Sequence, residues 1–201
     1  MEFSIGFEGD GFVLLAADTA ASHSIVMFKQ DQDKMVSLGK NTVMSVVGEP
    51  GDACQFSEYV QKNLQLYKMR NGYEVSTRGM ANFTRKILAE ALRKGPYFVH
   101  LLIGGCDPEE GCSLFFLDYL ASSIQVPFAA HGYGSYFTLS LLDRWHRKNL
   151  TKDEAVELLK RCMAELKKRF IVTLPAVTIR IIDKDGVHTL PLLKEEDYVT
   201  K

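Results

Sequence analysis

Residues 3–17, FSIGFEGDGFVLLAA, contain two apolar segments that are separated by Gly9-Asp10-Gly11. Glycine accepts a positive φ angle, so this tripeptide indicates a hairpin turn between two strands. The second segment, residues 12–17, is continuously apolar rather than alternating, which is typical of a strand covered on both faces. We therefore expect this strand to lie inside the molecule.

Outward from this hairpin, strand-like and helical segments alternate. Further strands are expected at residues 24–28, 42–47, 98–103, 114–120, 177–182 and 187–190. Helices are expected over residues 56–71, from the N-cap Ser76 to Gly95-Pro96, over 136–145, and from Thr151, with Glu154 completing a capping box. The buried face of the last helix is predicted to comprise Ala155, Leu158, Leu159, Cys162, Met163, Leu166 and Phe170. This order predicts helices outside sheets.

No linker, repeat or low-complexity segment divides the chain. We expect one domain over residues 1–201, with a polar C-terminal tail at 191–201 that is loosely held or docked on a neighbour. The 201 residues carry a net charge of −1, and 46% of them are hydrophobic and 24% charged, as in ordinary globular proteins. These values do not favour binding to nucleic acid or to a membrane, and the N-terminus has no secretory signal pattern.

The four cysteines are expected to be buried, reduced thiols. Cys106 and Cys112 flank a turn-like segment, so they could approach each other across a hairpin. This spacing leaves open a disulfide or half of a metal site. No histidine or second cysteine pair lies at a matching spacing, so we reject a zinc site.

The usual catalytic and cofactor-binding spacings are absent from the sequence, including Gly-x-Ser-x-Gly, the P-loop and His-Glu-x-x-His. His131 precedes Ser135 and invites a Ser–His interpretation, but a histidine at a strand end that bonds the backbone is favoured. The acidic turn at residues 183–186 is interpreted as a hairpin rather than a calcium loop. We expect no cofactor.

Five short segments, in order along nearly the whole chain, resemble the beta-type subunits of the proteasome, which are N-terminal nucleophile hydrolases in origin. They are residues 15–19 (LAADT), 33–35 (DKM), 48–53 (GEPGDA), 132–135 (GYGS) and 141–144 (LLDR). Within this family, three further segments are similar to the non-catalytic beta-4 (beta type-2) subfamily: residues 61–74, 128–134 and 168–171. The resemblance implies an α+β, four-layer αββα sandwich in which two antiparallel sheets lie between helix layers.

The resemblance also implies where catalytic groups would lie. Active members use an N-terminal threonine whose free amine serves as base, with a lysine and an aspartate nearby. Asp18 and Lys34 match that aspartate and lysine. The nucleophile position falls near Glu2, and no threonine precedes Thr19. We therefore expect no catalysis and interpret Asp18 and Lys34 as structural.

Other pocket positions differ from an active subunit as well. Tyr133 stands where the resemblance places a serine, and Phe170 and Thr173 stand where it places a second aspartate and its serine. Two alternatives remain open. One is an active hydrolase that uses a cryptic nucleophile, with candidates Ser4, Ser135 and Cys54, and the other is a free-standing small-molecule binding module of the same fold.

The implied role is architectural, within the core particle that degrades ubiquitinated proteins in the cytoplasm and nucleus. The implied partners are other beta-type subunits in a heptameric ring, the opposing beta ring, the adjacent alpha ring and assembly chaperones. Residues 51–70 and 138–146 are the expected contact helices.

Overall fold

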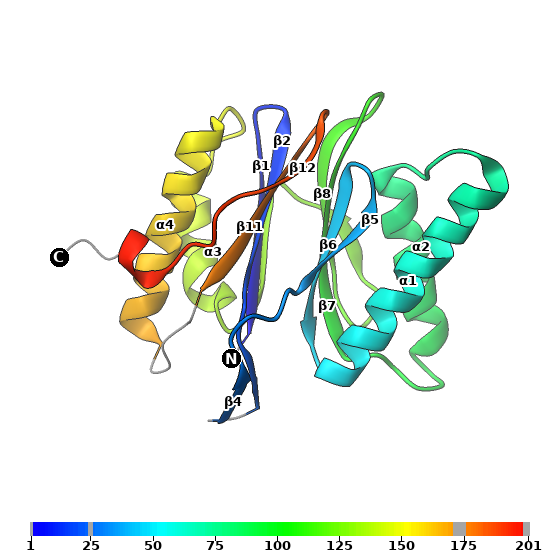
Figure 1. Cartoon of the computed structure of the whole chain (residues 1–201), viewed down its shortest axis with the longest axis horizontal. Coiled ribbons are helices and arrows are strands. Elements are labelled where there is room, and N and C mark those ends of the chain that lie inside the picture. Colours follow the sequence, from blue (N-terminus) through cyan, green and yellow to red (C-terminus); the bar gives the residue numbers. More distant parts are fainter. Residues whose placement is uncertain (1, 24–25, 171–175, 199–201) are drawn as a thin grey trace.

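The computed structural model describes residues 2–23, 26–170 and 176–198, and it contains two five-stranded sheets that face each other between two pairs of helices (Figure 1). Strand order is β10-β1-β2-β11-β12 in the first sheet and β5-β6-β7-β8-β9 in the second. Neighbouring strands run antiparallel in both sheets. The predicted four-layer αββα sandwich is confirmed.

The first sheet consists of β1 (Phe3–Gly9), β2 (Phe12–Asp18), β10 (Phe128–Gly132), β11 (Val177–Asp183) and β12 (Gly186–Thr189). The second consists of β5 (Met35–Gly39), β6 (Thr42–Gly48), β7 (Val99–Asp107), β8 (Gly111–Leu117) and β9 (Ser123–Gln125). The helices are α1 (Pro50–Asn71) and α2 (Thr77–Ala91) on the second sheet, and α3 (Ser135–Trp145) and α4 (Lys152–Arg169) on the first. A short 3-10 helix, η1, spans Glu195–Asp197.

Strand β2 lies at the centre of the sandwich, and all seven of its residues are buried. Side chains alternate across a strand. Accordingly, Phe12, Leu14 and Ala16 pack toward α3 and α4, whereas Val13 and Leu15 pack between the two sheets. Burial on both faces explains why this segment is continuously apolar, as we expected from the sequence.

Helix α1 begins at Pro50, ahead of the apolar pattern that predicted it, since proline is tolerated in the first turn. Phe56, Val60 and Leu64 are buried against the second sheet. Tyr59 and Tyr67 recur at the same helical spacing as these residues but are 51% and 38% exposed, so the spacing alone did not indicate which side chains are buried.

Helix α4 has the predicted capping box: the Thr151 hydroxyl accepts from the Glu154 N–H, and the Glu154 carboxylate accepts from the Thr151 N–H. Six of the seven residues of its predicted apolar face are buried. They are Ala155, Leu158, Leu159, Cys162, Met163 and Leu166. Phe170 lies just beyond the helix as its C-cap and is only partly buried.

We expect the substitution Thr151→Ala to lower the free energy of unfolding by about 1 kcal/mol, because it removes the oxygen that satisfies a first-turn amide. Equilibrium urea unfolding measures this change. Thr151→Ser retains the hydroxyl and should stay within a few tenths of a kcal/mol of the parent chain. Equal losses in the two variants would mean that the cap does not act through the hydroxyl.

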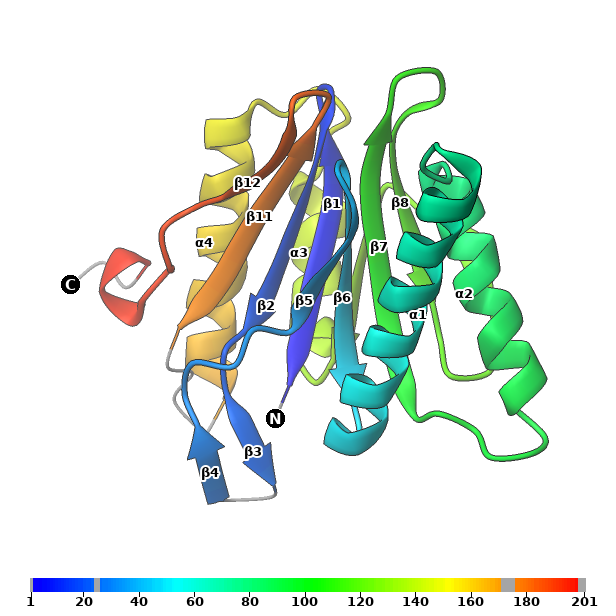
Figure 2. The same ribbon diagram turned by 45° about the vertical axis from the view of Figure 1, so that its right-hand side comes forward.

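The strand expected at residues 24–28 is only partly confirmed. Strand β4 spans Val26–Lys29, and residues 24–25 lie outside the described residues. It pairs with β3 (Ala21–His23) in a separate two-stranded sheet that extends past the main sheets, as Figure 2 shows. Val26 and Phe28 are 52% and 74% exposed, so apolar side chains here indicated strand propensity and not burial.

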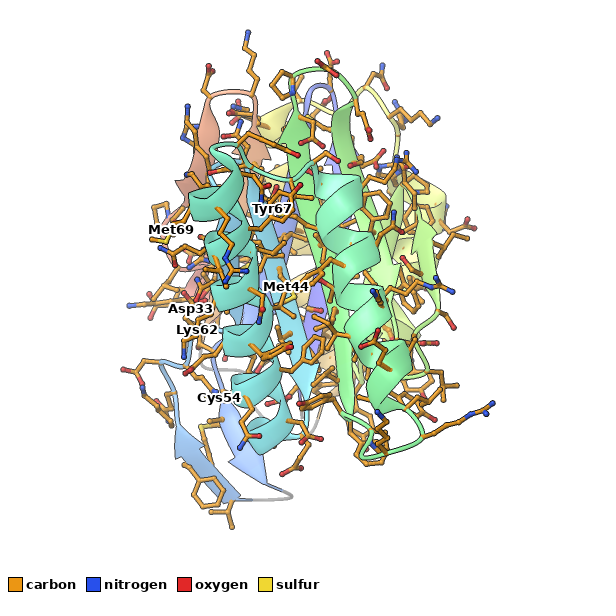
Figure 3. All side chains as sticks on the ribbon, turned by 90° about the vertical axis from the view of Figure 1, so that its right-hand side faces the viewer. Asp33, Met44, Cys54, Lys62, Tyr67 and Met69 are labelled. Carbon is orange, nitrogen blue, oxygen red and sulfur yellow. A yellow bond between two sulfur atoms is a disulfide. The ribbon has the colours of Figure 1, made fainter. Side chains whose placement is uncertain are left out.

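The expectation of four buried, reduced thiols was wrong for three cysteines. Cys106 and Cys112 occupy opposite positions in the register of β7 and β8, and their sulfur atoms are joined in a disulfide. Cys54 is exposed on α1 (Figure 3), whereas Cys162 is buried as expected. The hairpin register, which sequence spacing left open, decides between the disulfide and the half metal site.

The end of β8 differs from expectation, and the structure shows how part of the C-terminal tail is held. Strand β8 ends at Leu117 rather than 120, because Asp118 accepts the Ser122 N–H and Ala121 turns the chain with a φ of 64°. In the tail, Leu193 is buried and forms a β-bridge with Val177, so this part is docked on its own chain.

Within residues 2–23, 26–170 and 176–198, every helix is too short or too polar to cross a bilayer. In the same described part of the chain, no group of three or more His, Cys, Asp or Glu side chains is arranged to hold a metal ion.

Candidate functional site

A buried ion pair joins the end of β2 to the segment before β5. The Lys34 Nζ atom lies 2.8 Å from Asp18 Oδ2, and the two residues are 7% and 1% exposed. Asp18 also accepts hydrogen bonds from the backbone N–H groups of Phe3, at 2.9 Å, and Ala20, at 3.2 Å. The carboxylate therefore ties together three segments around the start of the first sheet.

Glu2 contributes a second carboxylate to the same lysine. Its Oε1 lies 3.1 Å from Lys34 Nζ, and its Oε2 accepts a 3.3 Å hydrogen bond from the Gly48 N–H at the end of β6. The Glu2 side chain is 20% exposed, in contrast to 0% for Asp18. The structure thus brings together the three residues that sequence comparison placed near the catalytic positions of the family.

The turn between β10 and α3 holds the Glu2 backbone in place. The Tyr133 N–H donates to the Glu2 carbonyl at 3.2 Å. Gly132 has a φ of 76°, and a Cβ atom on it would lie 2.0 Å from the same carbonyl oxygen. Only glycine allows this close approach, so the sequence Gly132-Tyr133 positions the residue that reaches Lys34.

Burial raises the pKa of Asp18, and the charge of Glu2 acts in the same direction, while Lys34 and the Phe3 N–H lower the pKa. Two carboxylates therefore share one ammonium group, and burial disfavours the charged form of Asp18. Removing the ammonium group would leave both carboxylates without a counter-charge, which makes Lys34 the electrostatic centre of the site.

A cavity of about 240 Å³ opens beside these groups and is lined by Glu2, Lys34 and Gly48, with Cys54 also on its wall. The Cys54 Sγ lies 3.8 Å from Glu58 Oε1. Sequence reasoning did not link Cys54 or the Gly48 N–H to this site, although both belong to or adjoin the GEPGDA segment. A larger cavity of about 510 Å³ lies beside Trp145 and Arg161, but Lys34 does not line it.

Three other pocket residues proposed from the sequence lie in different settings. Tyr133 is 62% exposed and contacts the site through its backbone. Phe170 packs against Phe137, with ring centroids 6.2 Å apart, in the apolar layer between the first sheet and its helices. Thr173 lies outside the described residues.

The remaining candidate nucleophiles differ in accessibility. Ser4 is fully buried. The Ser135 hydroxyl donates to the Gly132 carbonyl at 2.7 Å rather than to His131. Cys54 alone of the three proposed candidates combines an exposed position with the wall of the cavity.

His131 forms the backbone contact that the sequence predicted, with its Nε2 3.0 Å from the Leu101 carbonyl oxygen. The ring is buried between the sheets, stacks on Phe116 at 4.2 Å and lies 5.0 Å from the His100 ring. Burial is the main cause that lowers the His131 pKa to about 4, and His100 contributes.

This shift predicts acid lability. The folded chain favours neutral His131, so the stabilisation is complete above the ordinary pKa of 6.5 and is lost as the pH falls from 6.5 toward 4. The total loss should be roughly 3 kcal/mol. Urea unfolding at a series of pH values checks it, because His131→Gln should flatten this part of the profile. A profile unchanged by His131→Gln would contradict the assignment.

Comparisons with known proteins agree with this geometry. A family model described as "Proteasome subunit" matches residues 3–182. The chain is 48% identical over 188 residues to "Proteasome subunit beta type-2-A" of Arabidopsis thaliana, an alignment that covers 94% of this chain and 92% of the relative.

Fungal relatives give the same result. The chain is 43% identical to "Probable proteasome subunit beta type-4" of Neurospora crassa, covering 100% of this chain and 99% of the relative. It is 40% identical to "Proteasome subunit beta type-4" of Saccharomyces cerevisiae, covering 94% and 96%. With these matches and the αββα sandwich described above, the chain belongs to the proteasome subunit family, among the beta-type subunits that bear the names type-2 and type-4.

Proposed function

We propose that this chain is a non-catalytic, architectural beta subunit of the 20S proteasome core. The observation that carries the proposal is the position of Glu2: a carboxylate, paired with Lys34 and bonded to the Gly48 N–H, stands where the family resemblance places the threonine nucleophile. A carboxylate in this position has no adjacent hydroxyl and free amine, which the threonine mechanism requires.

The proposed partners are beta-type subunits in a heptameric ring, the opposing beta ring, the adjacent alpha ring and assembly chaperones, in the cytoplasm and nucleus. Residues 1–201 act as one domain in this proposal. Exposed apolar side chains on the two expected contact helices support it, since such patches mark protein interfaces. On α1 these include Met69, 73% exposed, and Tyr67 (Figure 3), and on α3 they include Trp145, 40% exposed.

Purification of the endogenously tagged chain, followed by native-gel sizing and identification of its partners, tests the architectural role. We expect a barrel-sized particle that contains other alpha- and beta-type subunits. Recovery as a monomer or small homo-oligomer would contradict the role and would favour a free-standing binding module.

Covalent probes directed at threonine, serine and cysteine nucleophiles test the absence of catalysis separately. In the purified particle we expect the neighbouring active subunits to be labelled and this chain to remain unlabelled. The alternative of a cryptic nucleophile rests on Cys54, so Cys54→Ala is the matched variant. Loss of one peptidase activity in a fully assembled Cys54→Ala particle would support that alternative.

A further inference from the structure

Two carboxylates share the Lys34 ammonium group, but the fold holds them differently. Asp18 is fully buried in the sheet and accepts two backbone hydrogen bonds in addition to its ion pair. Glu2 precedes the first strand, its side chain is 20% exposed, and its carboxylate makes one backbone hydrogen bond. Asp18 is therefore part of the core, whereas the Glu2 carboxylate is less buried and makes fewer backbone hydrogen bonds.

The groups that hold the Glu2 carboxylate are donors on rigid elements. The Lys34 side chain is only 4% exposed, and it presents a second N–H after its bond to Asp18. The Gly48 N–H comes from the end of β6, where a Cβ would lie 2.1 Å from the Phe98 carbonyl oxygen, so its direction is fixed by backbone packing. One cation and one backbone N–H, each facing one oxygen of the same carboxylate, form a carboxylate-binding site.

The adjoining cavity restricts what else could bind. Its volume of about 240 Å³ is below the ~300–1,000 Å³ of pockets for drug-sized ligands. The apolar side chains Val36, Val46 and Ala53 line it together with the acidic residues Asp33 and Glu58. The apolar wall suits a short aliphatic chain, and burying a second carboxylate against it would be costly. Asp33 and Glu58 are already paired with Arg180 and Lys62.

We propose that Lys34 and the Gly48 N–H form a binding site for short aliphatic monocarboxylates, which the Glu2 side chain occupies in cis. The site is closed while Glu2 is in place and accepts an external carboxylate when that side chain is removed. This inference requires only contacts within the chain and does not depend on the architectural role.

The test is rescue of Glu2→Ala by added carboxylate. In the full-length chain, this substitution should lower Tm by about 5 °C in chloride buffer, because the Gly48 N–H and part of the Lys34 charge lose their partner. Propionate or butyrate at constant ionic strength should restore at least half of that loss, saturably, and more effectively than the dicarboxylate succinate. The parent chain should show no such response.

Glu2→Gln is the matched control, because its amide fills the same space without the charge and should show no saturable response to propionate. Glu49→Ala removes an adjacent carboxylate outside the site and should behave like the parent chain. If Glu2→Ala does not fold in chloride, the readout becomes the yield of folded chain after refolding in propionate or in chloride. Equal responses of Glu2→Ala and Glu2→Gln, or equal refolding yields, would overturn the proposal.

Discussion

Replacing Lys34 with methionine is expected to lower the free energy of unfolding by about 3–5 kcal/mol, the usual cost of removing one partner from a buried ion pair. Methionine keeps most of the volume, so the loss reports charge rather than a void. Burial already raises the pKa of Asp18. In the variant, Asp18 loses its counter-charge and remains beside the Glu2 carboxylate. Equilibrium urea unfolding near pH 7 measures the effect.

Lys62→Met is the control, because the Lys62–Glu58 pair on α1 is 69% and 56% exposed and should contribute nothing measurable. The loss in the free energy of unfolding that Lys34→Met causes should be smaller at acidic pH, since protonated Asp18 needs no counter-charge. A deficit below about 1 kcal/mol at neutral pH would show that the Asp18–Lys34 pair is not a structural element of the core.

The second large effect is expected for Gly132→Ala, which should either prevent folding or lower stability by more than about 3 kcal/mol. Two costs combine here. The φ of 76° is strained for alanine, and the new Cβ would lie 2.0 Å from the Glu2 carbonyl oxygen. The chain must then move Glu2 away from Lys34 and Gly48. Far-UV circular dichroism and urea unfolding check this outcome.

Gly11→Ala separates the two costs. Gly11 has nearly the same φ, 72°, but a Cβ there meets nothing within 4 Å. Backbone strain alone should cost about 1–2 kcal/mol. If Gly132→Ala and Gly11→Ala lowered the free energy of unfolding equally, the close approach of Gly132 to Glu2 would make no contribution to stability.

Local signals predicted most of the secondary structure. The capping box at Thr151 and the 3.6-residue pattern of α4 depend on neighbours along the chain, and the structure confirms both. The sequence also predicted the burial of β2 on both faces. Failures occurred where burial is decided by distant segments. Phe28 is 74% exposed, since no described part of the chain covers it, and Tyr67 is 38% exposed although its ring contacts Tyr73.

The sequence by itself determined the alternation of strands and helices, the family resemblance and the grouping of Asp18, Lys34 and Glu2 near one site. Only the tertiary structure decided how these groups bond. The Gly48 N–H and the Tyr133 N–H approach Glu2 from 46 and 131 positions along the chain, and Cys106 meets Cys112 through the register of a hairpin. Such contacts depend on how sheets twist and pack. Periodicity describes one element at a time and therefore cannot specify them.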